Sequence, residues 1–273
     1  MFHPALESHT PIVKGLPRTG GKRFQSSDRQ TAHTTDPTGS ASPLISIIIV
    51  VLQDCNELQR VLESVLPRKS RDVEVIVIDG GSDDGSVELL RANDSDIDYW
   101  ASAPDRGLYD AMNTGIMVAR GRFIYHINAG DRLVYVPTNE LLHADEENAD
   151  VVSFVVALDR ERYFFPSSGW RLKLDNTLHH QGTFYRRSTF PGYNLKYRLF
   201  ADLDVNQRLK LRGARFKLFN NIVALHSANG LSNRGSSSAE LFRVVASNYG
   251  IAYVPLTWMT CKWKGLRRRL AKL

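Results

Sequence analysis

The sequence has no apolar run long enough to cross a membrane. A spanning helix needs about 20 consecutive apolar residues, and the most β-branched stretch, residues 44–51, is far shorter. The beginning of the chain, MFHPALESHTPIVKGLPRTGGKRF, also lacks the apolar core of a secretion signal. We therefore expect a cytoplasmic protein.

Cysteine is scarce, and the common phosphate-binding glycine motifs are missing. Cys55 and Cys261 lie far apart and form neither a CxxC pair nor a zinc spacing, which argues against a disulfide scaffold and favours a reducing compartment. The stretch Val51–Glu57, which follows the first predicted strand, contains no GxGxxG, and the chain has no P-loop. These absences argue against a dinucleotide-dependent oxidoreductase and a P-loop kinase.

Acidic residues are absent from the C-terminal segment. Residues 262–273 read KWKGLRRRLAKL, after the apolar and aromatic stretch Val254–Met259, and the whole chain has a formal net charge of +6. Two interpretations stay open: the segment binds an anionic membrane surface, or it forms a helix that packs on the domain with a solvated basic face. No nucleic-acid motif accompanies the charge, so nucleic acid is not an expected partner.

The 273 residues divide into three parts by composition. Residues 1–42 are rich in Ser, Thr, Gly, Pro and charge, without hydrophobic periodicity, and we expect a disordered tail. Residues 43–250 carry the strand and helix patterns of one domain, and residues 251–273 form a basic amphipathic tail. With 42% hydrophobic and 23% charged residues, the chain has the composition of an ordinary globular protein.

Strand and helix patterns alternate through the first half of the domain. The expected strands are residues 44–51, 73–78, 97–100 and 123–127, and helices are expected after Asn56, after Ser82 or Asp83, and over residues 108–119. This order predicts an α/β fold with a single, mostly parallel sheet flanked by helices. Ligands of such sheets bind beyond the carboxyl ends of the strands.

The second half mixes shorter elements. Residues 150–157 and 162–165 are expected to pair as a hairpin, and residues 183–185 to form a short strand. Helices are predicted over residues 202–211 and 236–249, with two further strands at 216–219 and 222–226. The two halves are expected to share one sheet and one core.

Acidic and amide side chains follow several of these strands. Asp79 ends the second strand and is followed by Gly80, and Asn128 and Asp131 follow the fourth. A carboxylate at a strand end can accept a hydrogen bond from a nucleoside, although aspartate also forms turns there. One or two carboxylates together with diphosphate oxygens are a usual way to hold Mg²⁺ or Mn²⁺. These positions are therefore candidate nucleotide and metal sites.

A second group of candidates lies in the other half. Asp202 and Asp204 open a predicted helix, where one carboxylate can face a cleft as a general base and the other can cap the helix. His180 and Gln181 precede a short strand and can line the acceptor pocket, which would hold the molecule whose hydroxyl gives up its proton to the general base. No third ligand stands at metal spacing from the histidine pair, so a structural hydrogen-bonding role is the alternative.

The order of these segments resembles the family 2 glycosyltransferases, within them the bacterial branch that builds colanic-acid-like polysaccharides and glycolipids. The likeness runs from Pro43 to about Asn233. It rests on PLISIIIVV, VIVIDGGSDDGS, APDRGLYDAMNTGI, ARGRF, NAGD, HHQGTFYRR, YNLKYRLFADLDVNQRL and ANGLSN. The resemblance implies the GT-A nucleotide-diphospho-sugar transferase fold and transfer from a nucleoside diphosphate sugar, usually with inversion at the anomeric carbon.

The resemblance also implies roles for single residues. Asp79 would contact the nucleoside, and Asp105 and Arg106 would lie near the ribose and diphosphate. Asp131 would be the last acid of the metal motif. Asp202 would be the general base, with Asp204 as the runner-up. Two departures stand out: the first strand carries Ile49, Leu52 and Gln53 at its nucleotide-facing end, and the metal motif has Asn128-Ala-Gly before its acid.

The sequence thus predicts a hexosyltransferase-type enzyme of cell-surface polysaccharide or glycolipid biosynthesis. The donor is a nucleoside diphosphate sugar, the acceptor is a saccharide or a lipid-linked group, and Mg²⁺ or Mn²⁺ is the cofactor. The enzyme is expected in the cytoplasm, with the inner membrane face as a site of peripheral attachment through the basic tail. The alternative is a non-catalytic, membrane-docked assembly partner that keeps the fold but not donor binding.

Overall fold

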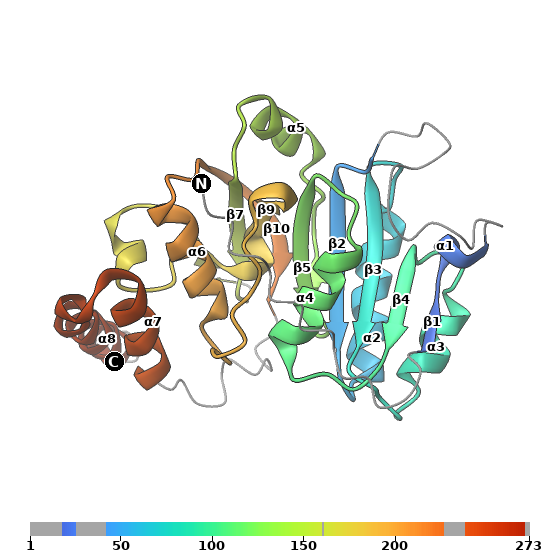
Figure 1. Cartoon of the computed structure of the whole chain (residues 1–273), viewed down its shortest axis with the longest axis horizontal. Coiled ribbons are helices and arrows are strands. Elements are labelled where there is room, and N and C mark those ends of the chain that lie inside the picture. Colours follow the sequence, from blue (N-terminus) through green and yellow to red (C-terminus); the bar gives the residue numbers. More distant parts are fainter. Residues whose placement is uncertain (1–17, 26–41, 160, 227–237, 271–273) are drawn as a thin grey trace, which may run out of the picture.

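A computed structural model describes residues 18–25, 42–159, 161–226 and 238–270. Its strands belong to one sheet of ten in the order β1-β4-β3-β2-β5-β9-β7-β10-β6, with β8 paired to β7 (Figure 1). The strands are β1 (Arg18–Gly20), β2 (Ile45–Val51), β3 (Val73–Asp79), β4 (Tyr99–Ser102), β5 (Phe123–Asn128), β6 (Arg132–Leu133), β7 (Val151–Ala157), β8 (Tyr163–Phe164), β9 (Thr183–Arg186) and β10 (Phe216–Leu225). This single sheet confirms the predicted fold class.

Six of the strands run in one direction. β2 is parallel to β3 and β5, and β3 is parallel to β4. β9 is antiparallel to both β5 and β7, and β7 is parallel to β10, so β7 and β10 point the same way as the first four. The carboxyl ends of these six strands therefore lie along one edge of the sheet, together with the start of β9.

Helices cover both faces of the sheet. They are α1 (Lys22–Gln25), α2 (Cys55–Val65), α3 (Ser86–Ala92), α4 (Leu108–Val118), α5 (Thr138–Glu146), α6 (Ala201–Leu211), α7 (Ser238–Tyr249) and α8 (Val254–Leu270). α2 and α3 lie on one face, and α4, α6 and α7 lie on the other. α7 and α8 gather at the end of the molecule opposite β1 (Figure 1).

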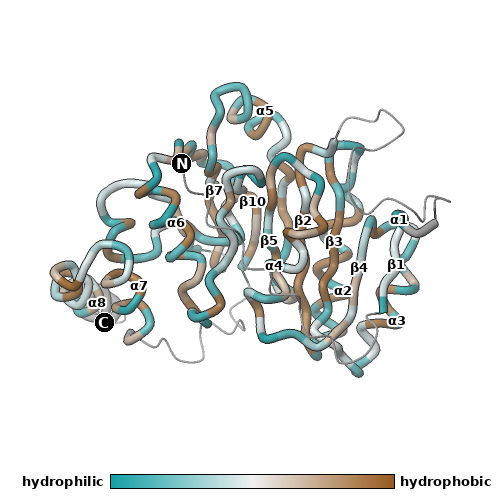
Figure 2. The backbone as a smooth tube through the Cα atoms, viewed as in Figure 1, coloured by the Kyte–Doolittle hydropathy of each residue, from teal (hydrophilic) through white to brown (hydrophobic). Residues whose placement is uncertain are grey.

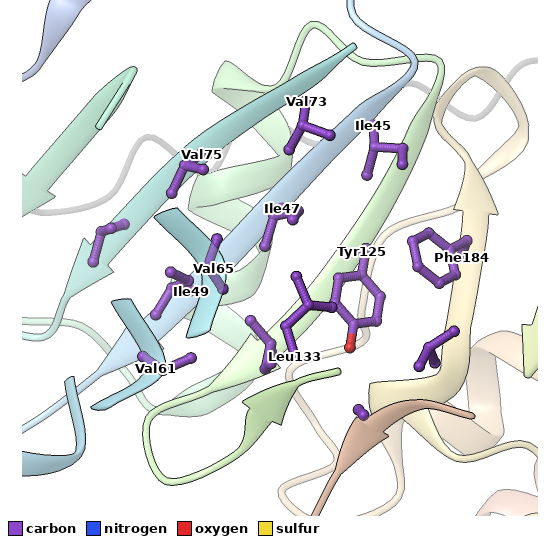
Figure 3. Close-up of a cluster of buried hydrophobic side chains, with 14 of the residues drawn as sticks. Ile45, Ile47, Ile49, Val61, Val65, Val73, Val75, Tyr125, Leu133 and Phe184 are labelled. Atoms are coloured by element: carbon purple, nitrogen blue, oxygen red, sulfur yellow. The ribbon is translucent and has the colours of Figure 1, made fainter. Parts of the chain in front are cut away.

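Side chains of β2 alternate between the two faces of the sheet and contribute to the hydrophobic core on each face. Ile45, Ile47 and Ile49 pack on the side of α2, whereas Ile48 and Val50 pack on the side of α4. Figure 3 shows the first cluster, in which these isoleucines meet side chains of α2, β3 and β5, and Figure 2 shows the same central strands as hydrophobic. A strand covered on both faces is a continuous apolar run in the sequence. For this reason β2 could be predicted from the sequence.

The first-half prediction is confirmed in its element types and shifted at some boundaries. The third strand begins at Tyr99, two residues later than expected, and α2 begins at Cys55 with Asp54, not Asn56, as its N-cap. The oxygen Oδ1 of Asp54 accepts from the backbone N–H of Glu57. Asp has the short side-chain oxygen that an N-cap requires, so the cap chemistry was anticipated but the position was wrong.

The second half holds the predicted hairpin, because β7 pairs with β8 in antiparallel fashion. The two strands expected at 216–219 and 222–226 are one strand, β10, with register irregularities between Leu218 and Ala224. Helix α5 was not anticipated. Its sequence, TNELLHADE, mixes acidic and apolar residues and does not place the apolar ones at a clear helical spacing. Its buried side chains are Leu141 and Ala144.

Part of the expected N-terminal tail is ordered. Within residues 1–42, Arg18–Gly20 pairs with β4 as an antiparallel edge strand, and a short helix follows. The guanidinium of Arg23 donates to the carboxylate of Glu74, which lies buried in β3, and to the carbonyl of Val118 at 2.7 Å. The expectation of disorder is therefore wrong for residues 18–25. Their order comes from long-range pairing, which local composition does not reveal.

The described part of the C-terminal tail is helical. Residues 254–270 form α8, and residues 271–273 lie outside the described ranges, as does the ANGLSN segment at 228–233. Over the described residues, no helix is both long enough and apolar enough to pass through a bilayer.

Candidate functional site

The carboxyl ends of the parallel strands bring the first candidates into one row. Asp79 lies opposite Val51 of β2 and Ser102 of β4 in the sheet register. Asn128 lies opposite Val50, on the other side of β2. Neighbouring strands are about 4.8 Å apart, so Asp79 and Asn128 are separated by about 10 Å across the sheet. Their common edge is the place where parallel sheets bind ligands.

Asp79 is enclosed by its own chain. Its carboxylate accepts from the backbone N–H of Ser82 at 2.9 Å, from the hydroxyl of Ser82 at 2.5 Å and from the hydroxyl of Ser102 at 2.6 Å. The side chain is fully buried. The nucleoside contact expected of Asp79 stays a prediction, and the geometry shows that this carboxylate holds the turn after β3 against the end of β4.

Gly80 and Asp105 meet directly beyond Asp79. A Cβ atom at residue 80 would lie 2.8 Å from Oδ2 of Asp105, so glycine makes room for this carboxylate. The other oxygen, Oδ1, accepts from the backbone N–H of Gly107 at 2.7 Å. Burial raises the pKa of Asp105 above its ordinary value. Arg106 is exposed, and its guanidinium donates to Asp110 at 2.9 Å.

Asp131 lies in the turn between β5 and β6 and is buried. The amide nitrogen of Gln181 donates to its Oδ2, and Nδ1 of His226 lies 3.0 Å from its Oδ1. The predicted metal-binding acid therefore contacts a side chain that precedes β9 and another that follows β10. Gln181, which was assigned to the acceptor side, lies on the side of the predicted metal acid.

Three imidazole rings connect Asp131 with Asp202. The ring of His226 lies 5.0 Å from that of His179, and the ring of His179 stacks on that of His180 at 5.4 Å between centroids. Nδ1 of His180 then lies 3.9 Å from Oδ2 of Asp202. The two acids that the sequence separates by about seventy residues thus stand at the two ends of one continuous cluster.

His180 is neutral in this cluster. Burial lowers its pKa to about 3, and the neighbouring His226 and His126 act in the same direction. The amide Nδ2 of Asn128 lies 3.1 Å from Nε2 of His180 and donates to it. A neutral ring that accepts at Nε2 carries its proton on Nδ1, the atom that faces Asp202. The contact with Asp202 is therefore not an ion pair.

Asp202 has the environment of a proton acceptor. Its carboxylate accepts from Asn176 Nδ2 at 2.6 Å, from the backbone N–H of Leu203 at 2.8 Å and from the Tyr109 hydroxyl at 3.4 Å. Burial raises its pKa to about 6, against these hydrogen bonds. A base whose pKa lies near the working pH combines ionisation with proton affinity, as general base catalysis requires.

Asp204 points to other partners. Its Oδ2 accepts from Nε of Arg208 at 2.8 Å, one turn along α6, and its Oδ1 accepts from Nδ2 of Asn248 in α7 at 3.1 Å. Residues two apart on a helix do not face the same way. This carboxylate joins α6 to α7, while Asp202 faces the histidine cluster.

Unpartnered polar atoms collect near Asp131. Oδ1 of Asn128, Oε1 of Gln181 and Nδ1 of His179 are buried without a hydrogen-bond partner. Buried polar atoms are normally paired, so these atoms are candidate ligands for a bound cation. Across residues 18–25, 42–159, 161–226 and 238–270, no three His, Cys, Asp or Glu side chains are already grouped to hold a metal. The donor set fits a divalent cation only if a ligand completes the coordination.

Three residues of the site escaped the sequence analysis. His226 follows the apolar run of β10 as Asp79 ends that of β3, and this shared pattern was a usable signal. Asn176 lies in a loop without any pattern. Glu240 of α7 accepts from the backbone N–H groups of Leu199 at 2.6 Å and Phe200 at 2.8 Å, and so holds the segment that leads into α6, the helix of Asp202.

A family model described as glycosyl transferase family 2 matches residues 46–203. Among curated proteins, an uncharacterized glycosyltransferase of Mycobacterium tuberculosis is 33% identical over 63% of this chain and 71% of its own length. A PGL/p-HBAD biosynthesis glycosyltransferase of Mycobacterium bovis is 31% identical over 71% of this chain and 80% of its own length.

Solved structures show the same fold at lower identity. TarS of S. aureus superposes with a TM-score of 0.58 and 14% identity over 75% of this chain, which spans 64%, less than two thirds, of that TarS chain. Glucosyl-3-phosphoglycerate synthase of Mycobacterium tuberculosis, solved with Mn²⁺, UDP and glucosyl-3-phosphoglycerate, gives a TM-score of 0.55 and 17% identity over 77% of this chain and 81% of its own. The shared architecture is the GT-A fold.

Proposed function

The chain belongs to glycosyl transferase family 2, and from that premise we propose that it moves a sugar from a nucleoside diphosphate sugar to a hydroxyl of a saccharide or lipid-linked acceptor. The observation that carries the proposal is the cluster that joins Asp131 to Asp202 at the carboxyl edge of the sheet. One end suits a diphosphate and its cation, and the other suits an acceptor hydroxyl.

Asp202 is proposed as the general base. Its raised pKa, of about 6, leaves it ionised at neutral pH yet basic enough to take a proton from an attacking hydroxyl. The acceptor oxygen then bonds to the anomeric carbon as the bond to the diphosphate breaks on the opposite face, which inverts the configuration. Neutral His180 leaves the charge of Asp202 uncompensated. Asn176 and Tyr109 orient the carboxylate.

Mg²⁺ or Mn²⁺ is proposed as the cofactor. Asp131 and His226 supply protein donors, and Asn128 and Gln181 add amide oxygens that have no partner. Diphosphate oxygens complete such sites for hard cations. When bound there, the cation neutralises the charge that develops on the leaving diphosphate. The Mn²⁺ in the complex of glucosyl-3-phosphoglycerate synthase is consistent with this proposal.

The donor nucleoside is proposed to lie over the turn after β3. Asp79 holds this turn, Gly80 leaves it open, and the half-buried carboxylate of Asp105 lies beside it. Arg106 is exposed near the same loop and can turn from Asp110 toward a phosphate. Asp79 is proposed to position the loop through the hydrogen bonds that it accepts from Ser82 and Ser102.

The pathway is proposed to be the assembly of a cell-surface polysaccharide or glycolipid in the cytoplasm. The relative named as a PGL/p-HBAD biosynthesis glycosyltransferase supports a role in a biosynthetic pathway. The proposal of a colanic-acid-like polysaccharide as the product rests on motif resemblance alone.

A melting-temperature screen of nucleotide sugars with and without Mn²⁺ tests the proposal. One UDP-, GDP- or dTDP-sugar should raise the melting temperature, and Mn²⁺ should enlarge the shift, because a ligand that binds only the folded state stabilises it. Hydrolysis or transfer with the same donor should then be measured by nucleotide release. If no nucleotide sugar stabilises the chain at millimolar concentration, the non-catalytic assembly partner is the better description.

A further inference from the structure

We propose that α8 is a membrane-contact helix that lies flat on an anionic lipid surface. The inference is independent of the sugar-transfer proposal and rests on the placement of apolar and basic residues on this helix. Figure 1 shows α8 at the outer end of the molecule, beyond α7, and Figure 2 shows hydrophobic segments along it.

One face of α8 attaches the helix to the domain. Thr257 is fully buried, and Cys261 of α8 and Tyr253, the residue just before the helix, pack against the second core cluster. The hydroxyl of Thr257 donates to the carbonyl of Tyr253 at 3.1 Å. Residues four apart share a face of a helix, so 257 and 261 define the inner side, next to Tyr253.

The opposite face is apolar and exposed. Leu256, Met259 and Trp263 follow spacings of three and four, and they are 48%, 60% and 52% exposed. The same spacing continues in the sequence at Leu266 and Leu270. Trp258 flanks this face, and the ammonium group of Lys262 lies 5.3 Å from its ring centroid. A packed end helix with a solvated basic face would bury Leu256, Met259 and Trp263, and these three side chains are exposed.

Charge selects the partner. No Asp or Glu occurs between residues 241 and 273, whereas the helix and its end carry Lys262, Lys264, Arg267, Arg268, Arg269 and Lys272. Amphipathic helices with Trp and Leu on one side and several Lys or Arg residues bind the interface of anionic bilayers. A second copy of this chain fits less well, because two acid-free basic helices would repel each other. We therefore infer that the partner of the exposed face of α8 is an anionic lipid surface.

Sedimentation with vesicles tests the inference on the full chain. It should pellet with phosphatidylglycerol–phosphatidylcholine vesicles and stay in solution with phosphatidylcholine alone, and added salt should weaken the binding. Met259→Asp should lower the apparent affinity by about tenfold or more, because it loses apolar burial and adds a repelled charge. Met117→Asp is the matched control: Met117 is an exposed methionine of α4, 76% accessible.

Tryptophan fluorescence gives a second measurement. Brominated lipids should quench the emission of Trp258 and Trp263, and the double variant Trp258→Phe/Trp263→Phe should lose that quenching. Trp170 lies outside α8 and is 67% exposed. The control variant Trp170→Phe should therefore keep the quenching by brominated lipids. Equal pelleting of Met259→Asp and Met117→Asp would overturn the proposal. So would a wild-type dimer that Met259→Asp converts to a monomer. The melting temperatures of Met259→Asp and Met117→Asp should equal that of the wild type, which shows that a loss of vesicle binding is not caused by unfolding.

Discussion

Nδ1 of His226 lies 3.0 Å from Oδ1 of Asp131, although the two residues are 95 positions apart in the chain. One follows β10 and the other precedes β6, and these two strands pair with each other. The contact makes His226 a direct partner of the predicted metal acid.

His226→Ala should weaken metal-dependent nucleotide binding, as Asp131→Ala should. Loss of a donor, or of the group that orients it, typically costs about 10–100-fold in metal affinity. Titration calorimetry with Mn²⁺ and the nucleotide found in the melting screen measures this. His143→Ala is the control, because this exposed histidine of α5 pairs with the nearby Glu146 and Glu147. Equal affinity in the His226 and His143 variants would remove His226 from the metal site.

Asp202→Asn should lower turnover by about 10²–10⁴-fold while donor affinity stays close to that of the wild type. The amide keeps the shape of the side chain but cannot accept a proton. Asp204→Asn should instead lower the free energy of unfolding, because it weakens contacts with Arg208 and Asn248. Steady-state kinetics and urea unfolding of both variants separate the roles. If Asp204→Asn shows the larger loss of turnover, the base is Asp204.

Activity should rise with pH through about 6 and level off above it. The pKa of Asp202 is about 6, and only the ionised carboxylate can accept the acceptor proton. The ratio kcat/KM measured from pH 4.5 to 8 should therefore follow one ionisation. A profile that is flat between pH 5 and 7 would contradict the assignment.

The same carboxyl should make stability depend on pH. Its pKa is raised in the folded state from an ordinary 3.8 to about 6, so the folded protein binds more protons between these values. The free energy of unfolding contributed by this group is therefore full below about pH 4 and is lost as the pH rises through about 6. Each pKa unit corresponds to about 1.4 kcal/mol. Urea unfolding of Asp202→Asn should lack this fall, and identical pH curves for the two proteins would refute it.

Arg23→Ala should lower the free energy of unfolding by about 2 kcal/mol, because hydrogen bonds to charged groups contribute about 1.5–3 kcal/mol each. The guanidinium serves both the buried carboxylate of Glu74 and the carbonyl of Val118. Lys22→Ala is the neighbouring control, since Lys22 is exposed. Urea unfolding compares them. Equal stabilities would mean that residues 18–25 contribute nothing to the fold in solution.

Much of the fold could be predicted from local patterns. β2 and β3 are short β-branched runs, and β5 is a short run of aromatic and aliphatic residues around His126. The residues that end β3 and β5, Asp79 and Asn128, could be located because a strand end is visible in the sequence. The family assignment is confirmed by the match over residues 46–203. Helix α5 and strand β1 were missed, since neither has a strong periodicity and β1 is ordered by pairing with β4.

The candidate site was only half visible in the sequence. The residue types were found because carboxylates after strands and at a helix start stand out. Their partners were not, because His226, Asn176 and Glu240 reach the site through contacts between distant segments. Gln181 was placed on the acceptor side, and its amide in fact donates to Asp131.

The sequence by itself determined the sheet, the acids at its edge and the family, because strand and turn preferences act over a few residues and are written locally. Only the tertiary structure decided that Asp202 rather than Asp204 faces the histidine cluster, and that His180 lies between Asn128 and Asp202. These choices depend on β9 running antiparallel between β5 and β7 and on α7 packing on α6. Burial created by that packing also raises the pKa of Asp202, a property that no single segment possesses.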